Sequence, residues 1–187
     1  ASAAPRRNTA SGAMAGPIWA PEIHPVEERW FLYFSAGEGG QPWDSIRVFA
    51  LENPAANSLE GTWTARGQVT TQWDTFTLDA TTFVHQGVRY FVWAQVEPGV
   101  VGTNIMIAEM DSPTSLTGPQ VILSRPEYDW EVQGGVWVNE APAALVRGGK
   151  VFITYSASAT DQNYCMGLLS ADASADLRLE FLRQTRR

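Results

Sequence analysis

Two carboxylates stand at similar places in two similar stretches of the chain. Asp79 lies in LDATTFVHQGVRYFVWAQ (78–95), and Glu140 lies 61 residues later in NEAPAALVRGGKVFITYSAS (139–158). If both side chains face one cavity, burial and the charge of one acid can keep the other protonated. A carboxyl that gives its proton to a leaving oxygen, beside a second carboxylate, is typical of glycoside hydrolysis. The alternative is that both acids cap turns at strand ends.

The two stretches belong to an internal repeat, whose first copy is IWAPEIHPVEERWFLYFSA (18–36). Each copy begins with a short run of apolar or small residues, passes a turn, and ends in aromatic and β-branched residues. In this alignment Trp19, Asp79 and Glu140 are equivalent, at spacings of 60 and 61 residues. A repeat of this length is typical of solenoids, propellers and arrays. The repeat therefore predicts that the equivalent positions converge on a shared site.

The rest of each copy consists of strand-like runs separated by turns. SIRVFALENP (45–54) matches NIMIAEMDSP (104–113), and both runs stop at a proline. The third copy continues with CMGLLSAD (165–172). Weaker runs, WTARGQV (63–69) and GPQVIL (118–123), add a fourth strand to the first two copies. Four short antiparallel strands make one blade of a β-propeller.

The sequence therefore predicts an all-β chain of about three four-stranded blades, at residues 17–70, 76–123 and 136–180. The composition agrees, because 16 Gly and 11 Pro supply turns, and 8 Trp, 8 Phe and 5 Tyr suit half-buried strands. The tail at 171–184 is the one segment whose pattern allows a helix. Propellers close with roughly four to eight blades. We therefore expect residues 1–187 to form a partial catalytic propeller that lacks its first and last blades.

Charge and hydropathy exclude two classes of partner. The net charge of −7 and the pI near 4.8 argue against nucleic acid, because phosphate binding needs a basic face. The chain has no run of 18 apolar residues, so we expect no membrane partner. A single cysteine, Cys165, is expected to be a buried core residue. One cysteine leaves both an extracellular and a cytoplasmic location open.

The sequence predicts neither a metal nor a cofactor. His, Cys, Asp and Glu residues do not cluster at the spacings that metal ligands need. The glycine-rich loop GEGG (37–40) lacks the Gly-Lys-Ser/Thr that completes a phosphate-binding loop. His24 and His85 lie in predicted turns, where surface histidines are common. We therefore expect the chemistry to depend on the carboxylates.

Three segments together resemble a known family. PIWAPEIH (17–24), LDATTFVHQGVRYFVWAQ (78–95) and VNEAPAALVRGGKVFITYSAS (138–158) are similar to glycoside hydrolase family 43, most closely its arabinan-active α-L-arabinofuranosidases. The resemblance covers about residues 11–172. It implies a five-bladed β-propeller that hydrolyses plant cell-wall polysaccharide with inversion. It also implies three carboxylates: a general base, a general acid, and a second acid that tunes and orients.

The resemblance assigns roles to residues of this chain. Asp79 matches the tuning acid, and Glu140 matches the general acid, although Ala141 stands where the family often has Gly. Trp19 matches an aromatic side chain at the mouth of the substrate pocket. From their positions beside Glu140, we also expect Trp137 and Asn139 to contact sugar, because apolar sugar faces stack on aromatic rings.

The general base has no counterpart in the chain. Counting back one repeat from Trp19 leads to a position before residue 1. Glu22 is the nearest substitute, but it lies off the axis and a structural role is expected. Asp44 follows Trp43 in a glycine-rich connection and is expected to be a turn acid, with the cavity rim as the alternative. Loss of a general base removes a factor of ~10²–10⁴ in rate, so the fragment is expected to be inactive alone.

Several functions stay open at this point. The first is an α-L-arabinofuranosidase, and the second is a β-xylosidase of the same family. The third is a carbohydrate-binding propeller fragment without turnover. The expected partner in each case is an arabinose- or xylose-containing oligosaccharide or polysaccharide, which favours an extracellular protein. Exo and endo attack cannot be distinguished from these residues.

Overall fold

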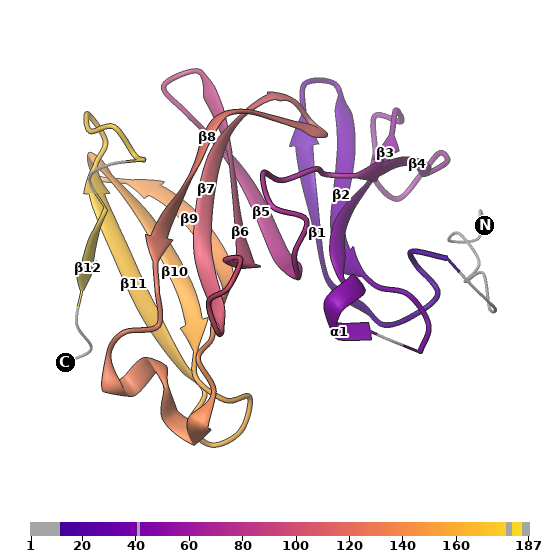
Figure 1. The fold of residues 1–187 in the computed structure, drawn as a ribbon. Coiled ribbons are helices and arrows are strands. Elements are labelled where there is room, and N and C mark those ends of the chain that lie inside the picture. The colour runs from indigo at the N-terminus through magenta and orange to yellow at the C-terminus, as the bar shows by residue number, and fades with distance from the viewer. Residues whose placement is uncertain (1–11, 41, 179–180, 185–187) are drawn as a thin grey trace.

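The structure, a computed structural model, describes residues 12–40, 42–178 and 181–184. These residues form three antiparallel sheets of four strands each, set side by side like the blades of a fan (Figure 1). The expectation of an all-β chain with three four-stranded units is therefore confirmed.

In each sheet the strands pair in the order in which they follow in the sequence. The first sheet holds β1 (Ile18–Val26), β2 (Arg29–Ala36), β3 (Arg47–Asn53) and β4 (Thr64–Gln68). The second holds β5 (Thr77–His85), β6 (Val88–Val96), β7 (Thr103–Ser112) and β8 (Ser115–Ser124). The third holds β9 (Asn139–Arg147), β10 (Lys150–Ala157), β11 (Cys165–Asp172) and β12 (Leu182–Gln184). The connections contain three short helical turns: α1 (Pro42–Ser45), η1 (Asp129–Glu131) and η2 (Gln133–Gly135).

The tail corrects one expectation. The described part of residues 171–184 forms the end of β11, turns and β12, and no helix. β12 pairs antiparallel with β11, with Leu168 opposite Gln184, so the third sheet extends beyond residue 180. The helical pattern was misleading because the outer edge of β11 offers backbone donors and acceptors, and strand pairing satisfies them directly.

The burial pattern distinguishes the second sheet from the third. On β6, the run from Tyr90 to Gln95 is buried without interruption, because both faces of the second sheet are covered. On β10, buried and partly exposed residues alternate from Val151 to Ala157, as expected for a strand with one covered face. One apolar cluster joins the second and third sheets, and another joins the first and second. The second sheet is therefore the core of the described chain.

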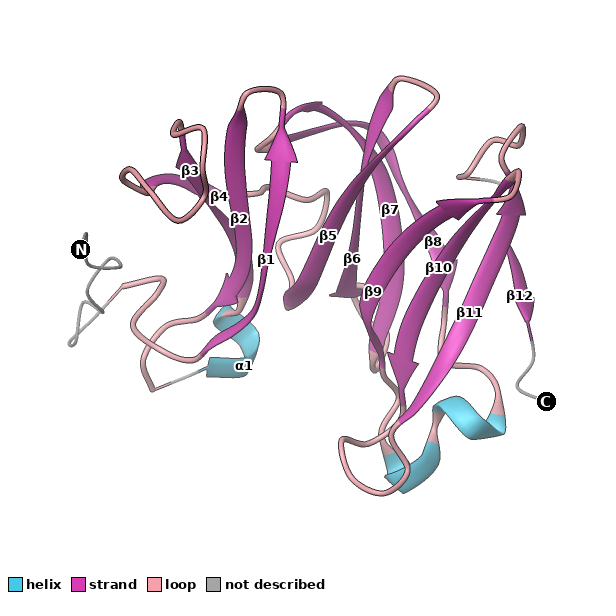
Figure 2. Ribbon diagram, turned by 180° about the vertical axis from the view of Figure 1, so that it is seen from behind, coloured by secondary structure: helices cyan, strands magenta, loops and turns pink. Residues whose placement is uncertain are grey.

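The first strands of the three sheets lie next to one another. Viewed from behind, β5 stands between β1 and β9 and contacts both (Figure 2). Each of these strands turns back into its neighbour through a tight turn, and in Gln86-Gly87 and Gly148-Gly149 both turn residues have positive φ. Such two-residue turns match the twist of paired strands. The arrangement brings the beginnings of β1, β5 and β9 to one place, beside α1.

Candidate active site

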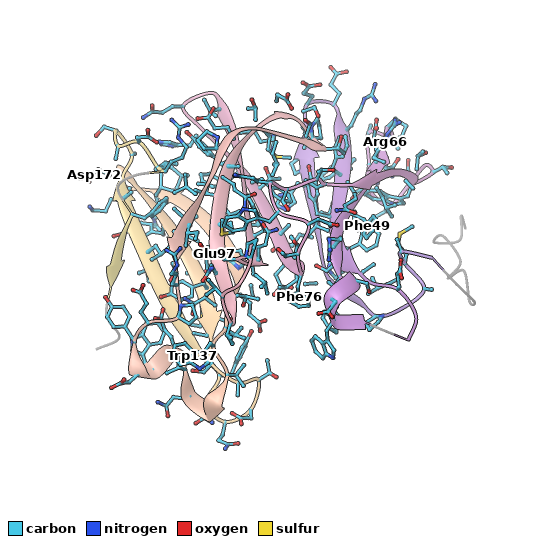
Figure 3. All side chains as sticks on the ribbon, viewed as in Figure 1. Phe49, Arg66, Phe76, Glu97, Trp137 and Asp172 are labelled. Atoms are coloured by element: carbon cyan, nitrogen blue, oxygen red, sulfur yellow. The ribbon has the colours of Figure 1, made fainter. Side chains whose placement is uncertain are left out.

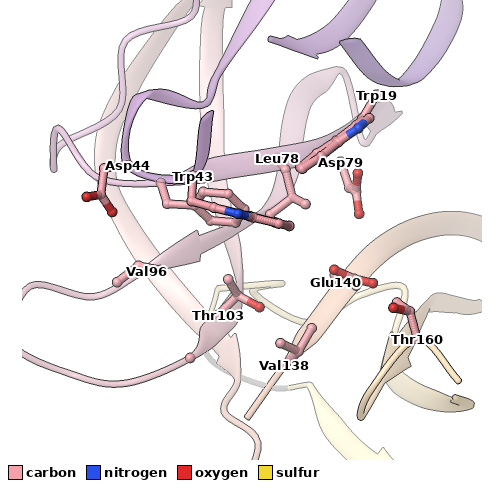
Figure 4. A pocket seen from close by; sticks show the side chains of 12 residues that line it. Trp19, Trp43, Asp44, Leu78, Asp79, Val96, Thr103, Val138, Glu140 and Thr160 are labelled. Carbon is pink, nitrogen blue, oxygen red and sulfur yellow. The ribbon is translucent and has the colours of Figure 1, made fainter. Parts of the chain in front are cut away.

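A cavity of about 550 Å³ opens where the first strands of the three sheets converge. This volume lies within the range of small-molecule sites, ~300–1,000 Å³. Figure 4 shows the carboxylates of Asp79 and Glu140 turned toward each other at one end of the cavity. The lining residues are Trp19, Trp43, Asp44, Phe76, Leu78, Asp79, Val96, Gly102, Thr103, Val138, Glu140 and Thr160.

The first strand of each sheet (β1, β5 and β9) carries one extra residue where it borders the cavity. The register slips between Trp19 and Glu22 on β1, between Leu78 and Thr81 on β5, and correspondingly between Glu140 and Ala143 on β9. Two residues opposite one on the partner strand form a β-bulge, which bends the strand and redirects its side chains. The bulges thus set the directions in which the candidate side chains leave the strands.

The bulges also correct the alignment of the repeat. The left-handed residue in the three bulges is Ala20, Asp79 and Ala141, with φ of 43°, 52° and 49°. Asp79 is therefore equivalent to Ala141, and Leu78 to Glu140, both at a spacing of 62 residues, whereas Ala20 and Asp79 are 59 residues apart. The sequence alignment paired the two acids because they are chemically alike, whereas the position of a bulge leaves no mark on residue type. The two acids occupy adjacent register positions and still face one cavity.

The carboxylate of Asp79 is held between the sheets. Its Oδ2 accepts a hydrogen bond from the backbone amide of Ala141 at 3.1 Å, and its own amide donates to Ser35 Oγ at 3.1 Å. Burial raises the pKa of Asp79 to about 6, and the charges of Glu140 and Glu22 act in the same direction, against the amide of Ala141. Asp79 is therefore fixed in place and easily protonated.

Glu140 lies at the start of β9 and is partly buried. Burial raises its pKa, and the hydroxyl of Tyr164, which donates to Glu140 Oε1 at 2.7 Å, opposes that shift. Because Asp79 and Glu140 influence each other, their protons are lost in coupled steps that belong to the pair. Burial thus favours the protonated form of both acids.

An aromatic wall lies beside the two acids. The rings of Trp19 and Trp43 are tilted against each other with centroids 5.3 Å apart, and Trp43 and Phe76 are 6.2 Å apart. The Trp43 side chain is 63% exposed, so its face is open to a ligand. Sequence reasoning selected Trp19 and passed over Trp43, although its place in a glycine-rich connection was a usable signal. Such rings suit the apolar faces of sugars.

Asn139 and Trp137 lie elsewhere than expected. Asn139 is fully buried, and its Nδ2 donates to Ser124 Oγ at 2.8 Å and to Glu131 Oε1 at 3.1 Å. Trp137 is exposed and does not line the cavity; Figure 3 places it at the edge that carries the short helical turns. Strand alternation turns the Asn139 side chain away from the cavity and into the core, whereas Trp137 precedes β9 and lies outside the cavity lining.

Sequence reasoning did not identify Glu131, whose carboxylate hydrogen-bonds to the segment that leads into β9. Its carboxylate is fully buried and accepts hydrogen bonds from the amides of Glu127 and Tyr128, both at 2.9 Å. It also accepts from the Tyr155 hydroxyl at 2.7 Å and from Asn139. This network fastens the segment before β9 to the third sheet. Glu131 therefore holds the residue next to Glu140.

The weaker candidates have local roles. Asp44, on α1, lines the cavity rim but points away from Asp79 and Glu140 in Figure 4. Glu22 is half-buried and hydrogen-bonded to His24 Nε2 at 2.9 Å, which lowers its pKa against the effect of burial. Cys165 is buried, as expected, and its Sγ donates to the Trp130 carbonyl at 3.2 Å.

Among the described residues, no group of three or more His, Cys, Asp or Glu side chains is placed to hold a metal ion. Over the same part of the chain, no helix is long and apolar enough to cross a membrane. The cavity brings together the two acids, Asp79 and Glu140, and the aromatic side chains of Trp19, Trp43 and Phe76. This set can donate a proton to a leaving group on a stacked sugar.

The comparisons with known proteins agree with this geometry. The chain is 52% identical over 168 residues to the extracellular exo-α-(1→5)-L-arabinofuranosidase of Streptomyces chartreusis, which covers 89% of this chain and 51% of that protein. It is 50% identical over 173 residues to α-L-arabinofuranosidase 43 of Humicola insolens, and this match covers 91% of this chain and 35% of that protein. The crystal structure of α-L-arabinofuranosidase from Lactobacillus brevis matches with a TM-score of 0.87 at 44% sequence identity. This match covers 92% of this chain and 56% of that chain.

The chain spans between about a third and a half of the length of these curated relatives. Its three sheets correspond to three blades of a five-bladed propeller, over about half of the matched structure. Residues 1–178 match the family described as Glycosyl hydrolases family 43. The chain, with its paired acids at the blade axis, belongs to glycosyl hydrolases family 43.

Proposed function

We propose that this chain is part of an inverting glycosidase that hydrolyses α-L-arabinofuranosyl linkages in plant cell-wall polysaccharide. The observation that carries the proposal is the shared cavity of Asp79 and Glu140. Family membership supports a glycosidase. Relatives with about half of their matched residues identical are named arabinofuranosidases, which supports arabinose over xylose as the released sugar.

In the proposed reaction, Glu140 gives its proton to the glycosidic oxygen while the bond between that oxygen and the anomeric carbon breaks. The electron pair of this bond stays on the leaving oxygen. A water molecule attacks the anomeric carbon from the opposite face, and a general base takes its proton. The free sugar has inverted configuration, and exchange with solvent restores both carboxyl groups.

Asp79 has a supporting role in this proposal. Its carboxylate is fixed beside the proton donor by the amide of Ala141, and it is charged at pH values above its pKa of about 6. A neighbouring negative charge favours the protonated form of an acid. Asp79 therefore helps Glu140 to keep its proton until substrate is bound. Trp19 and Trp43 stack on the substrate, with Trp43 providing the more open face.

A general base completes the set, and we propose that it is supplied from outside these 187 residues. Inversion places the base ~6.5–9.5 Å from the acid, across the sugar. The cavity lining among the described residues contains Asp44, Asp79 and Glu140, and Asp44 points away from the other two (Figure 4). The 187-residue polypeptide alone is therefore expected to hydrolyse arabinofuranosides at least ~10²-fold more slowly than its relatives.

A chimaera tests both parts of the proposal. In it, the matched segment of the Streptomyces chartreusis relative is replaced by the corresponding segment of this chain, which is 52% identical. Hydrolysis of 4-nitrophenyl α-L-arabinofuranoside is compared between the chimaera and the 187-residue polypeptide. Glu140→Gln is expected to lower turnover in the chimaera by at least ~10²-fold while sugar binding survives. Glu28→Gln, in an exposed turn at the far end of β1, is the matched control.

The outcomes separate the alternatives. Full activity of Glu140→Gln would contradict the assignment of the acid. Faster hydrolysis of 4-nitrophenyl β-D-xyloside than of the arabinofuranoside would favour a β-xylosidase. Sugar binding without turnover of either substrate would favour a non-catalytic binding propeller. We also propose an extracellular location, because polysaccharide lies outside cells and the Streptomyces chartreusis relative is named extracellular.

A further inference from the structure

Tyr164, in the loop that precedes β11, places its hydroxyl against the carboxyl of Glu140 on β9. It donates to Glu140 Oε1 at 2.7 Å. Tyr164 precedes β11, whereas Glu140 is the second residue of β9, and Ser156 on β10 is the cross-strand partner of Glu140. Ser156 also hydrogen-bonds to Tyr164. The three side chains thus lie together at one end of the third sheet, and Glu140 lines the cavity.

Backbone hydrogen bonds hold the loop between β10 and β11, which contains Tyr164. The amide of Ser158 donates to the Val138 carbonyl at 3.1 Å, and the amide of Ala159 donates to the Gln133 carbonyl at 3.2 Å. The amide of Tyr164 itself donates to the Asp161 carbonyl at 3.1 Å. These bonds hold the backbone before Tyr164, and the pairing of Cys165 with Ala157 at the start of β11 holds the backbone after it. Tyr164 therefore presents its hydroxyl to Glu140 from a defined position.

The position of this hydrogen bond decides which oxygen of Glu140 carries a proton. A protonated carboxyl has one hydroxyl oxygen, which donates, and one carbonyl oxygen, which accepts. Because the Tyr164 hydroxyl donates to Oε1, that oxygen is favoured as the carbonyl, and the proton is favoured on Oε2. The same donor also stabilises the ionised form of Glu140.

Tyr164 stays a donor over the whole range in which Glu140 titrates. Burial raises the pKa of the Tyr164 phenol to about 12, the hydrogen bond with Ser156 opposes this, and the charge of Glu140 adds to it. The phenol therefore keeps its proton while the Glu140 carboxyl titrates.

We propose that Tyr164 is a positioning residue that holds the Glu140 carboxyl with Oε2 as the protonated oxygen. The inference rests on the proposed function, since it gives Glu140 the role of proton donor. In the reaction, Oε2 would deliver the proton to the glycosidic oxygen while Oε1 stays bound to Tyr164. As the acid ionises, the Tyr164 hydroxyl stabilises the carboxylate that forms.

The other titratable groups near Glu140 are few among the described residues. Asp79 on β5 faces it directly, and Glu22 on β1 acts on Asp79. Asp44 on α1 lines the opposite part of the cavity. A change made at Tyr164 leaves these acids in place. Its effect on the titration of Glu140 can therefore be assigned to the lost or altered hydrogen bond.

The test follows the titration of Glu140 by carbon NMR in the 187-residue protein labelled at glutamate carboxyls, with the signal assigned from its loss in Glu140→Gln. Tyr164→Phe is expected to move the titration of Glu140 to higher pH, because the carboxylate loses a donor. Replacement of Tyr164 by 3,5-difluorotyrosine, whose hydroxyl is a stronger hydrogen-bond donor, is expected to move the titration of Glu140 to lower pH. Tyr128→Phe is the matched control, because Tyr128 is similarly exposed, at 38%, and the donor recorded for Glu140 is Tyr164.

Opposite shifts from the two Tyr164 changes, with no shift in Tyr128→Phe, would support the inference. A titration of Glu140 that is the same in wild type and Tyr164→Phe would overturn it. The result is independent of turnover. If the shifts are found but the chimaera hydrolyses no arabinofuranoside, the proposed function fails and the hydrogen bond keeps its effect on Glu140. If arabinofuranoside is hydrolysed but no shift is found, only the role of Tyr164 fails.

Discussion

Asp79 Oδ2 accepts the backbone amide of Ala141 at 3.1 Å, so an acid of the second blade is bound to the residue that follows Glu140 in the third. Both residues sit at the left-handed position of a β-bulge, with φ of 52° and 49°. Left-handed backbone in non-glycine residues is uncommon and concentrates at functional sites. The bond therefore links the two candidate acids through the backbone and keeps their separation constant.

Replacement of Asp79 by Asn is expected to stabilise the fold at neutral pH. The pKa of Asp79 is raised from 3.8 to about 6, so the folded state binds more protons than the unfolded state between these values. Stability from this group is present below pH 3.8 and is lost as pH rises through 6. Because Asn keeps an acceptor for Ala141, Asp79→Asn should gain roughly 2 kcal/mol at pH 7 and nothing at pH 3.5.

Urea unfolding of both proteins at the two pH values measures this difference. Asp111→Asn, at an exposed position, is the control and should change the unfolding free energy little at either pH. Equal stability of Asp79→Asn and wild type at pH 7 would show that the folded protein does not disfavour the Asp79 charge.

The buried carboxylate of Glu131 should be a large contributor to stability. Glu131→Ala leaves the donors of Tyr155, Asn139 and two backbone amides without their acceptor, which should lower the unfolding free energy by about 3 kcal/mol or more. Tyr155→Phe removes one donor and keeps the ring, so its expected cost is about 1 kcal/mol. Similar losses for the two variants, measured by urea unfolding, would argue against the network.

Gly102 should be irreplaceable for steric reasons. A Cβ there would lie 2.0 Å from the Trp137 carbonyl, which accepts the amide of Thr103 just before Glu140 begins its strand. Gly99 also has positive φ, but nothing lies within 4 Å of its added Cβ. Gly99→Ala should therefore cost only ~1–2 kcal/mol for the left-handed backbone. Gly102→Ala should cost at least ~1 kcal/mol more, by thermal or urea unfolding.

Trp43 should contribute to binding and little to stability. Its exposed side chain forms part of the aromatic wall with Trp19 and Phe76. Trp43→Ala should weaken binding of an arabino-oligosaccharide by about tenfold, the loss of ~1.4 kcal/mol of stacking. Its unfolding free energy should change by less than ~0.5 kcal/mol. Calorimetric titration of the chimaera measures the binding, with the exposed Trp137→Ala as control. Unchanged affinity in Trp43→Ala would remove this ring from the site.

Much of the fold could be predicted from the sequence, because strands and turns repeat their residue types. The runs around Phe91 and Ile153 carry the aromatic and β-branched residues that a packed sheet needs. β12 could not be predicted, because its pairing depends on the free edge of β11. The local pattern also allows a helix there, and the pairing with β11 decides for a strand.

The site was predictable only where residue type carries the chemistry. Asp79, Glu140 and Trp19 were selected by type and place, and the structure brings all three to one cavity. Asn139 was selected by adjacency alone, and the strand turns it into the core. Tyr164 gave no signal, because its contact with Glu140 spans 24 residues and two strand connections.

The pairing of the two acids can be measured directly by carbon NMR titration of aspartate-labelled protein, with and without Glu140→Gln. If Asp79 and Glu140 share one cavity, Asp79 should titrate near its pKa of about 6 in the wild type. Removal of the Glu140 charge should then lower the pKa of Asp79. The same titration curve for Asp79 in both proteins would contradict the shared site on which the proposed chemistry depends.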